Sequence, residues 1–389
     1  MKKSKLIKKL FTTTLLSTLA LSSTVVVNAA SVTYNADNSN STILTDPLPF
    51  NQITFNSVSN ITIAGAVNTA ALGTSGILIN NSTPRFDNIV KSTNSLNGIA
   101  NTYDSNSIFN KDVIMSNNTD SGILAASPIN FMTFNGPVTL NNNTNYGLRN
   151  LNGKLIFNAP VAISYSNKGV YNAPLSNASI VFNDNVTINN TTNYAIHSLA
   201  PLTFNKDLFL NDNNIGLYIQ YSTYSLVTIN GNVTGVNNTG GDIMMSNSTN
   251  LIFNNNTILN ANIKATSNGN GNVEFTGGPT INEQLGANGV NLASVTFSAG
   301  SGNTAALHKD IYANTMILNA LTIHIKSPLT INAPTIITNR TSFLLSKDLI
   351  VNGAMTDPSS LRIAITGAGR LIIAGNMALN TAIRAAAAG

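Results

Sequence analysis

The sequence predicts an all-β protein, a parallel β-helix (β-solenoid) whose rungs of about 23 residues each contain three short strands. A phenylalanine-centred segment recurs along the chain, and a pair made of a small and an apolar residue recurs with the same period. The segments between them are short, rich in Val, Ile, Thr and Phe, and punctuated by Asn, Gly, Asp and Pro, which is a strand-and-turn pattern. One such rung cannot bury its apolar face alone, so the repetition predicts stacking.

The first series is an apolar run followed by Phe, usually Asn, two turn-forming residues and an alternating apolar stretch, as in FNGPVTLNNN from Phe134 and FNDNVTINNT from Phe182. We predict that these phenylalanines form an internal column, in which each buried ring contributes about 1.5–3 kcal/mol. The residues in this phase are Phe86, Phe109, Phe134, Phe157, Phe182, Phe204, Phe253, Phe275 and Phe297, with Ile229 between the sixth and the seventh.

The asparagine that follows the ring keeps the same phase. The sequence contains 64 Asn, a number that biased composition can explain, but composition does not explain why they follow Phe. Side chains stacked about 4.7–4.8 Å apart can bond to one another along the rod axis. We therefore predict an amide ladder of Asn110, Asn135, Asn158, Asn183, Asn205, Asn230 and Asn254.

The second series pairs a small residue with an apolar one, from Gly76-Ile77 through Gly169-Val170 and Ala195-Ile196 to Gly216-Leu217. It predicts a place in each rung where the backbone turns sharply or passes close to another strand.

The N-terminal segment has the order of a secretory signal peptide. Five lysines precede an uncharged stretch from Leu10 to Val27, and small residues follow. We predict cleavage after Ala29, with Ala30 as the second choice. From Ser31 onward 15 cations balance 15 anions, so the net charge of +5 belongs to this segment. The scattered charges that remain exclude nucleic acid as the expected partner.

The predicted organisation is a signal peptide at 1–29, an N-terminal cap with the first rungs at 30–75, a regular solenoid at 76–311, and a less regular β continuation with a truncated C-terminus at 312–389. The chain has no Cys, so packing and backbone hydrogen bonds must hold it together without disulfides.

No catalytic, cofactor-binding or metal-binding residue is predicted, and no cofactor is expected. His197, His308 and His324 lack metal-ligand spacing, and His324 alternates with apolar residues as an outward strand residue does. The densest acidic group is Asp184, Asp207 and Asp212. The Lys-Asp pairs that begin at Lys111 and Lys206 are expected to be solvated turns about 19 Å apart.

The export signal, the Cys-free Asn-rich body, the FNGPVTLNNN-type units and the segment ITGAGRLIIAG from Ile365 make the chain resemble the passenger region of bacterial autotransporters, and rickettsial surface-cell-antigen outer-membrane proteins in particular. The resemblance implies a solenoid displayed at the outer membrane or secreted, acting as an adhesin and surface antigen. The implied partners are a host-cell receptor or matrix, and an outer-membrane translocator barrel that this chain does not encode.

Two alternatives remain open. β-Helices include secreted polysaccharide lyases and glycosidases, which need acids and a basic residue gathered on one face. The chain could also be a non-functional fragment of a split autotransporter gene.

Overall fold

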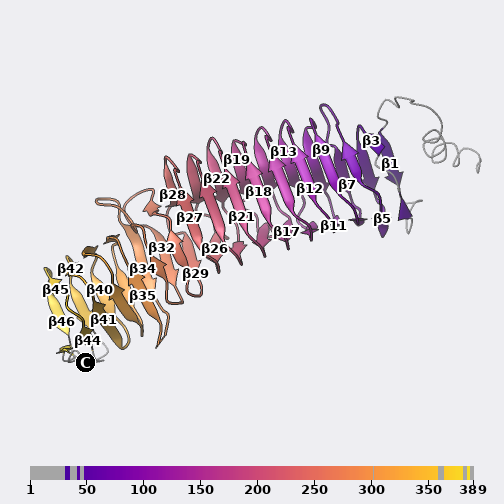
Figure 1. The fold of residues 1–389 in the computed structure, drawn as a ribbon. Helices are drawn as coiled ribbons and strands as arrows, with labels where there is room; N and C mark the ends of the chain where they lie inside the picture. Colours follow the sequence, from indigo (N-terminus) through magenta and orange to yellow (C-terminus); the bar gives the residue numbers. More distant parts are fainter. Residues whose placement is uncertain are drawn as a thin grey trace, which may run out of the picture.

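The protein is an all-β solenoid of about 14 turns, with rungs about 23 residues apart, as the sequence predicts. A computed structural model describes residues 31–35, 42–43, 48–300, 302–357, 363–379 and 383–385. Figure 1 shows the rungs stacked in chain order into a rod, from the first rungs in indigo to the last in yellow. The predicted signal peptide and its cleavage position at Ala29 lie outside the described residues.

Each rung contributes one strand to each of three sheets, which we name A, B and C in chain order. Sheet A has 11 strands and is continued, through isolated bridges at Leu285, by a sheet of four. Its strands are β1 (Val32–Asn35), β4 (Ile53–Asn56), β7 (Ile77–Asn80), β10 (Asn97–Thr102), β13 (Ser121–Ala125), β16 (Tyr146–Asn150), β19 (Lys168–Asn172), β22 (Tyr194–Ser198), β25 (Ile215–Ile219), β28 (Gly241–Met245) and β31 (Ile263–Ala265), followed by β36 (Ile311–Tyr312), β39 (Leu329–Asn332), β42 (Leu349–Val351) and β45 (Leu371–Ile373).

Sheet B has 16 strands and contains the phenylalanine series. Its strands are β2 (Thr42–Ile43), β5 (Ile61–Ile63), β8 (Pro84–Phe86), β11 (Asn106–Phe109), β14 (Phe131–Phe134), β17 (Lys154–Phe157), β20 (Ser179–Phe182), β23 (Leu202–Phe204), β26 (Leu226–Ile229), β29 (Asn250–Phe253), β32 (Asn270–Phe275), β34 (Leu292–Phe297), β37 (Met316–Leu318), β40 (Thr335–Ile337), β43 (Met355–Asp357) and β46 (Met377–Leu379).

Sheet C also has 16 strands. They are β3 (Leu48–Phe50), β6 (Val67–Thr69), β9 (Val90–Thr93), β12 (Val113–Ser116), β15 (Val138–Asn141), β18 (Val161–Ser164), β21 (Val186–Asn189), β24 (Leu208–Asn211), β27 (Val233–Val236), β30 (Ile258–Asn260), β33 (Thr280–Ile281), β35 (Thr304–Leu307), β38 (Thr322–Ile325), β41 (Thr341–Leu345), β44 (Ile363–Thr366) and β47 (Ile383–Ala385).

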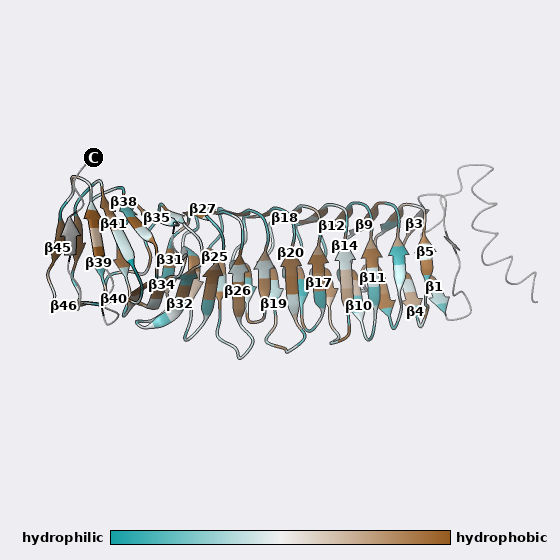
Figure 2. Cartoon of the chain, turned by 90° about the horizontal axis from the view of Figure 1, so that it is seen from below, coloured by the Kyte–Doolittle hydropathy of each residue, from teal (hydrophilic) through white to brown (hydrophobic). Residues whose placement is uncertain are grey.

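The core lies inside the rungs, because alternate residues of each strand point inward. Val138 and Leu140 of β15 are buried while Thr139 between them is exposed, and the same alternation recurs in β18. Figure 2 shows the consequence as apolar strands joined by more hydrophilic turns. In the described part of the chain the named strands all pair in parallel, and no helix is long and apolar enough to cross a membrane.

Rung length changes along the rod. Phe109 pairs with Phe134, 25 residues later, whereas Ile311 pairs with Ile331, 20 residues later. The shorter rungs begin where the predicted regular region ends, and they leave less chain for the turns.

The corner between sheets C and A is built from two polar residues that the sequence reading did not assign. The first has a left-handed backbone, as at Asn117 and Asn142 with φ of 54° and 53°. The second turns inward, as at Asn118 and Asn143, which are fully buried. Asn143 Oδ1 accepts hydrogen bonds from the Asn118 backbone N–H at 3.3 Å and from its Nδ2 at 2.8 Å, so this corner is bonded to the rung before it.

Candidate functional site

The predicted phenylalanines stack in the interior. Every ring from Phe86 to Phe204, and again from Phe253 to Phe297, is buried, and successive centroids lie 4.6–5.2 Å apart with planes within 20° of parallel. Ile229 occupies the phase between the two stacks. These residues hold the rod together and are closed to a ligand.

The predicted asparagines form one continuous hydrogen-bonded ladder on the turn between sheets B and C. Each Nδ2 donates to the Oδ1 of the rung before, at 2.6–2.8 Å, along the series Asn110, Asn135, Asn158, Asn183, Asn205, Asn230 and Asn254. Asp87 accepts at one end and Thr276 donates at the other. The ladder consumes the amide groups that a ligand on this edge would need.

The small residues of the second series lie where neighbouring rungs come closest. A Cβ placed on Gly169 would lie 2.4 Å from the backbone oxygen of Ala195, and one on Gly147 would lie 2.7 Å from that of Gly169. The chain approaches itself at this point because the strand bulges, so the residues before and after each small–apolar pair both point outward.

The acids singled out in the sequence do not converge. Asp207 and Asp212 flank the four-residue strand β24, so they lie about 16 Å apart at the usual rise per residue. Asp184 accepts a hydrogen bond from the Asn185 backbone, and Asp207 accepts one from that of Asn232. Among the residues that the structure describes, no three His, Cys, Asp or Glu side chains are placed to hold a metal ion.

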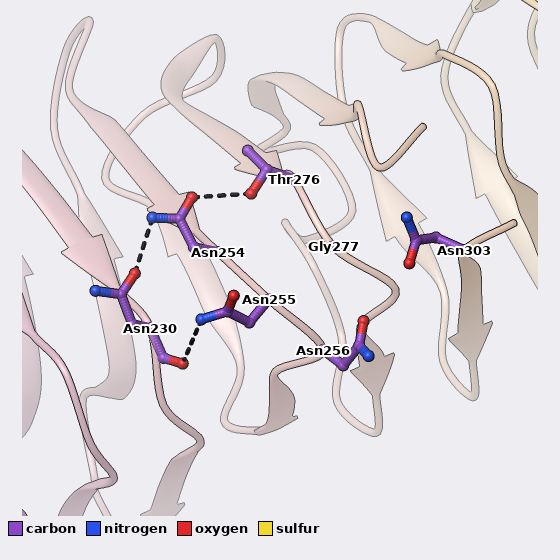
Figure 3. Close-up of a pocket in the computed structure, with 7 residues that line it drawn as sticks. All are labelled: Asn230, Asn254, Asn255, Asn256, Thr276, Gly277 and Asn303. Carbon is purple, nitrogen blue, oxygen red and sulfur yellow. Dashed lines mark hydrogen bonds between the residues drawn. The ribbon is translucent and has the colours of Figure 1, made fainter. Parts of the chain in front are cut away.

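A shallow hollow opens where the amide ladder ends (Figure 3), and it is lined by Asn230, Asn254, Asn255, Asn256, Thr276, Gly277 and Asn303. Most of its polar groups already bond to one another or to backbone, as Asn254 does with Thr276 and Asn256 does with the Gly278 N–H. The hollow contains no ionisable group, and it can offer only neutral hydrogen bonds.

The chemically richest surface is the outer face of sheet A, on four consecutive strands from β16 to β25. Its side chains form two columns, set by the strand register. We call it the tyrosine face and define it as Tyr146, Lys168, Tyr194 and Ile215 in the first column with Arg149, Tyr171, His197 and Tyr218 in the second.

Lys168 lies at the centre of one half of this face. Its Nζ is 5.6 Å, 5.1 Å and 5.8 Å from the ring centroids of Tyr146, Tyr171 and Tyr194. A cation over a tyrosine ring is attracted by the electron-rich ring face. No carboxylate of the described chain lies within ion-pair distance of Lys168, whereas Arg149 pairs with Asp120 at 3.3 Å.

His197 organises the other half. Its ring centroid lies 5.3 Å from Tyr171, 4.9 Å from Tyr194 and 5.2 Å from Tyr218. Its Nε2 lies 2.7 Å from Oε1 of Gln220, so Nε2 carries the proton and Nδ1 is the unprotonated nitrogen. Nδ1 is buried and has no hydrogen-bond partner among the described residues, as expected of a neutral ring.

Burial sets the protonation of the face. It lowers the pKa of His197 to about 4, with the Lys168 charge acting in the same direction and the Gln220 bond opposing it. Burial, and then the Arg149 charge, lowers the pKa of Lys168. Burial raises the pKa of Tyr171 and Tyr194. At neutral pH the face therefore has neutral rings around an ammonium group.

One edge of the face is a row of uncharged amides. Asn145, Asn167, Asn193 and Asn214 each directly precede a residue of the first column. Asn167 and Asn214 accept hydrogen bonds from threonines of the following rung and remain exposed. Flat aromatic rings, one uncompensated cation and an amide edge form a surface suited to binding, without the paired acids of a hydrolytic site.

Sequence reasoning missed this face, although a signal for it was present. The residues on both sides of the small–apolar pair are aromatic or cationic in Tyr146-Gly-Leu-Arg149, Lys168-Gly-Val-Tyr171 and Tyr194-Ala-Ile-His197. In the two preceding repeats, the same positions are Asn97 with Ala100 and Ser121 with Leu124.

Comparison of the chain with family models, curated proteins and solved structures gives no match.

Proposed function

We propose that the chain is an exported, autotransporter-passenger-like β-solenoid that acts as a surface adhesin without a catalytic site, and that the tyrosine face is its binding surface. The observation that carries the binding role is the gathering of four tyrosines, His197 and an unpaired Lys168 on four successive strands. Half-buried aromatic side chains beside a cation are the groups that most often dominate the free energy of binding at protein surfaces.

The rest of the rod serves as a rigid spacer. Its core columns run past the face on both sides, so the face is held on strands and not on loops. The export signal and the family resemblance support display outside the cell, since both are features of the sequence.

The test is saturable binding of the purified, fluorescently labelled chain to cultured mammalian cells. Tyr194→Ala should reduce the apparent affinity about tenfold or more. The matched control is Tyr312→Ala on β36, which also changes a half-buried tyrosine of the sheet A side. Absence of saturable binding, or equal losses in the two variants, would contradict the proposal.

A further inference from the structure

We infer that the tyrosine face binds an acidic saccharide, a chain of sugar rings that carries carboxylate or sulfate groups. The inference rests on the proposed function and names the ligand class of the same surface.

The first argument is shape. The rings of Tyr146, Tyr171, Tyr194 and Tyr218 pack against one another or against His197, and each is half-buried. They therefore form an apolar floor flush with the sheet. Four strands at about 4.8 Å spacing span about 14 Å, so the floor suits an extended ligand of several flat units whose C–H faces pack on rings.

The second argument is charge complementarity. Lys168 has no carboxylate partner among the described residues, and Arg149 is the only other cation of the defined face. Arg149 also shares its positive charge with Lys168 at close range, because it lowers the pKa of the lysine. A ligand anion over Lys168 would offset this repulsion and form a charge-assisted hydrogen bond.

The third argument is the number of charges. A nucleic acid or a polyacidic peptide presents a negative charge at every unit and needs a track of Lys and Arg. The face provides one unpaired cation and the tyrosine rings, with neutral asparagines at its edge. That combination suits a polymer with sparse charge and many hydroxyl groups, which amides can bind by donating and accepting hydrogen bonds.

The inference is tested by calorimetry of the purified chain with defined probes. They are a heparin hexasaccharide, a hyaluronan hexasaccharide, neutral chitohexaose and inorganic sulfate. At least one acidic hexasaccharide should bind about tenfold or more tightly than chitohexaose, and inorganic sulfate should not compete. Heparin alone assigns a sulfate ligand, and binding of both acidic probes assigns the carboxylate as sufficient.

Lys168→Gln should weaken the acidic probe about tenfold, while Lys168→Arg should retain binding because the cation is kept. The matched control is Lys154→Gln, which removes a lysine that also lies over a ring, 5.3 Å from Phe131, on sheet B. A retained thermal unfolding midpoint in Lys168→Gln separates loss of binding from loss of fold.

Four results would overturn the inference. They are equal affinity for chitohexaose, an unchanged affinity in Lys168→Gln, tighter binding of an oligoglutamate or an oligo-dT strand than of any saccharide, and undiminished attachment to cells stripped with heparinase, hyaluronidase and sialidase. The last result would leave the adhesin proposal standing, whereas the absence of attachment to untreated cells would remove the adhesin proposal itself.

Discussion

Asn110 donates a 2.6 Å hydrogen bond from Nδ2 to Oδ1 of Asp87, and that bond begins a ladder of eight. All amides of the ladder point their N–H groups toward the first rungs, so their dipoles add along the rod. The carboxylate of Asp87 lies at the positive end, where a negative charge is most stabilising. Arg85 bonds to the same oxygen at 2.7 Å.

Acid should weaken this end of the ladder. The hydrogen bond from Arg85, and then the one from Asn110, hold the pKa of Asp87 below its usual 3.8. A carboxyl group with a depressed folded pKa stabilises the fold above its unfolded pKa and loses that contribution as the pH falls through the folded value. In urea unfolding, Asp87→Asn should therefore be less stable than wild type at pH 7, and the difference should shrink toward pH 2. Asp112→Asn, on another B-to-C turn, should leave the pH profile unchanged, and a constant difference for Asp87→Asn would contradict the role of the charge.

A carboxylate inside the ladder should be harmful. Asn205 donates to Asn183 and accepts from Asn230, each at 2.6 Å. Asn205→Asp removes the donor and sets two oxygens against each other, which should cost about 1–2 kcal/mol at pH 7. Protonation of the introduced carboxyl restores a donor, so the loss should diminish below about pH 4. Asn177→Asp, in the exposed loop after β19, is the control, and equal losses in the two variants would show that the ladder does not stabilise the rod.

The aromatic column should dominate stability. Phe157→Ala empties a fully buried position between two stacked rings and should cost about 3–5 kcal/mol. Phe131→Ala, on the neighbouring strand, removes a ring that is 41% exposed and should cost less than about 1 kcal/mol. Chemical denaturation compares the two. Similar values would mean that the stack contributes no more than an exposed ring.

The stability of the tyrosine face should depend on pH through His197. Its folded pKa of about 4 lies below the usual 6.5, so the unfolded chain binds the proton more readily between those values. The contribution of His197 is complete above pH 6.5 and should fall by about 3 kcal/mol as the pH approaches 4. His197→Asn should flatten the stability profile in that window, whereas His308→Asn should leave it as in wild type. A titration of the His197 ring by NMR with a midpoint near 6.5 would contradict this account.

The inward half of each rung was predictable from the sequence, and the outward half was not. Phe134 and Asn135 recur in phase because burial and the ladder constrain the same position in every rung. Tyr171 and His197 are constrained by neither, and only the strand register makes them neighbours. The corner asparagines such as Asn118 and Asn143 were hidden for a different reason, because one left-handed residue before them reverses the usual inward–outward alternation.

Site-specific photo-crosslinking tests the central claim most directly, since it reports which face of the rod touches a cell. Benzoylphenylalanine is placed singly at Tyr171, Tyr218, Tyr103 and Tyr312, and the labelled chains are irradiated on cultured mammalian cells. Tyr171 and Tyr218 lie on the tyrosine face, whereas Tyr103 follows β10 and Tyr312 ends β36. The account predicts crosslinks to cell-surface material from the first two positions and not from the last two. Crosslinking of equal yield at all four, or at Tyr103 and Tyr312 alone, would contradict it.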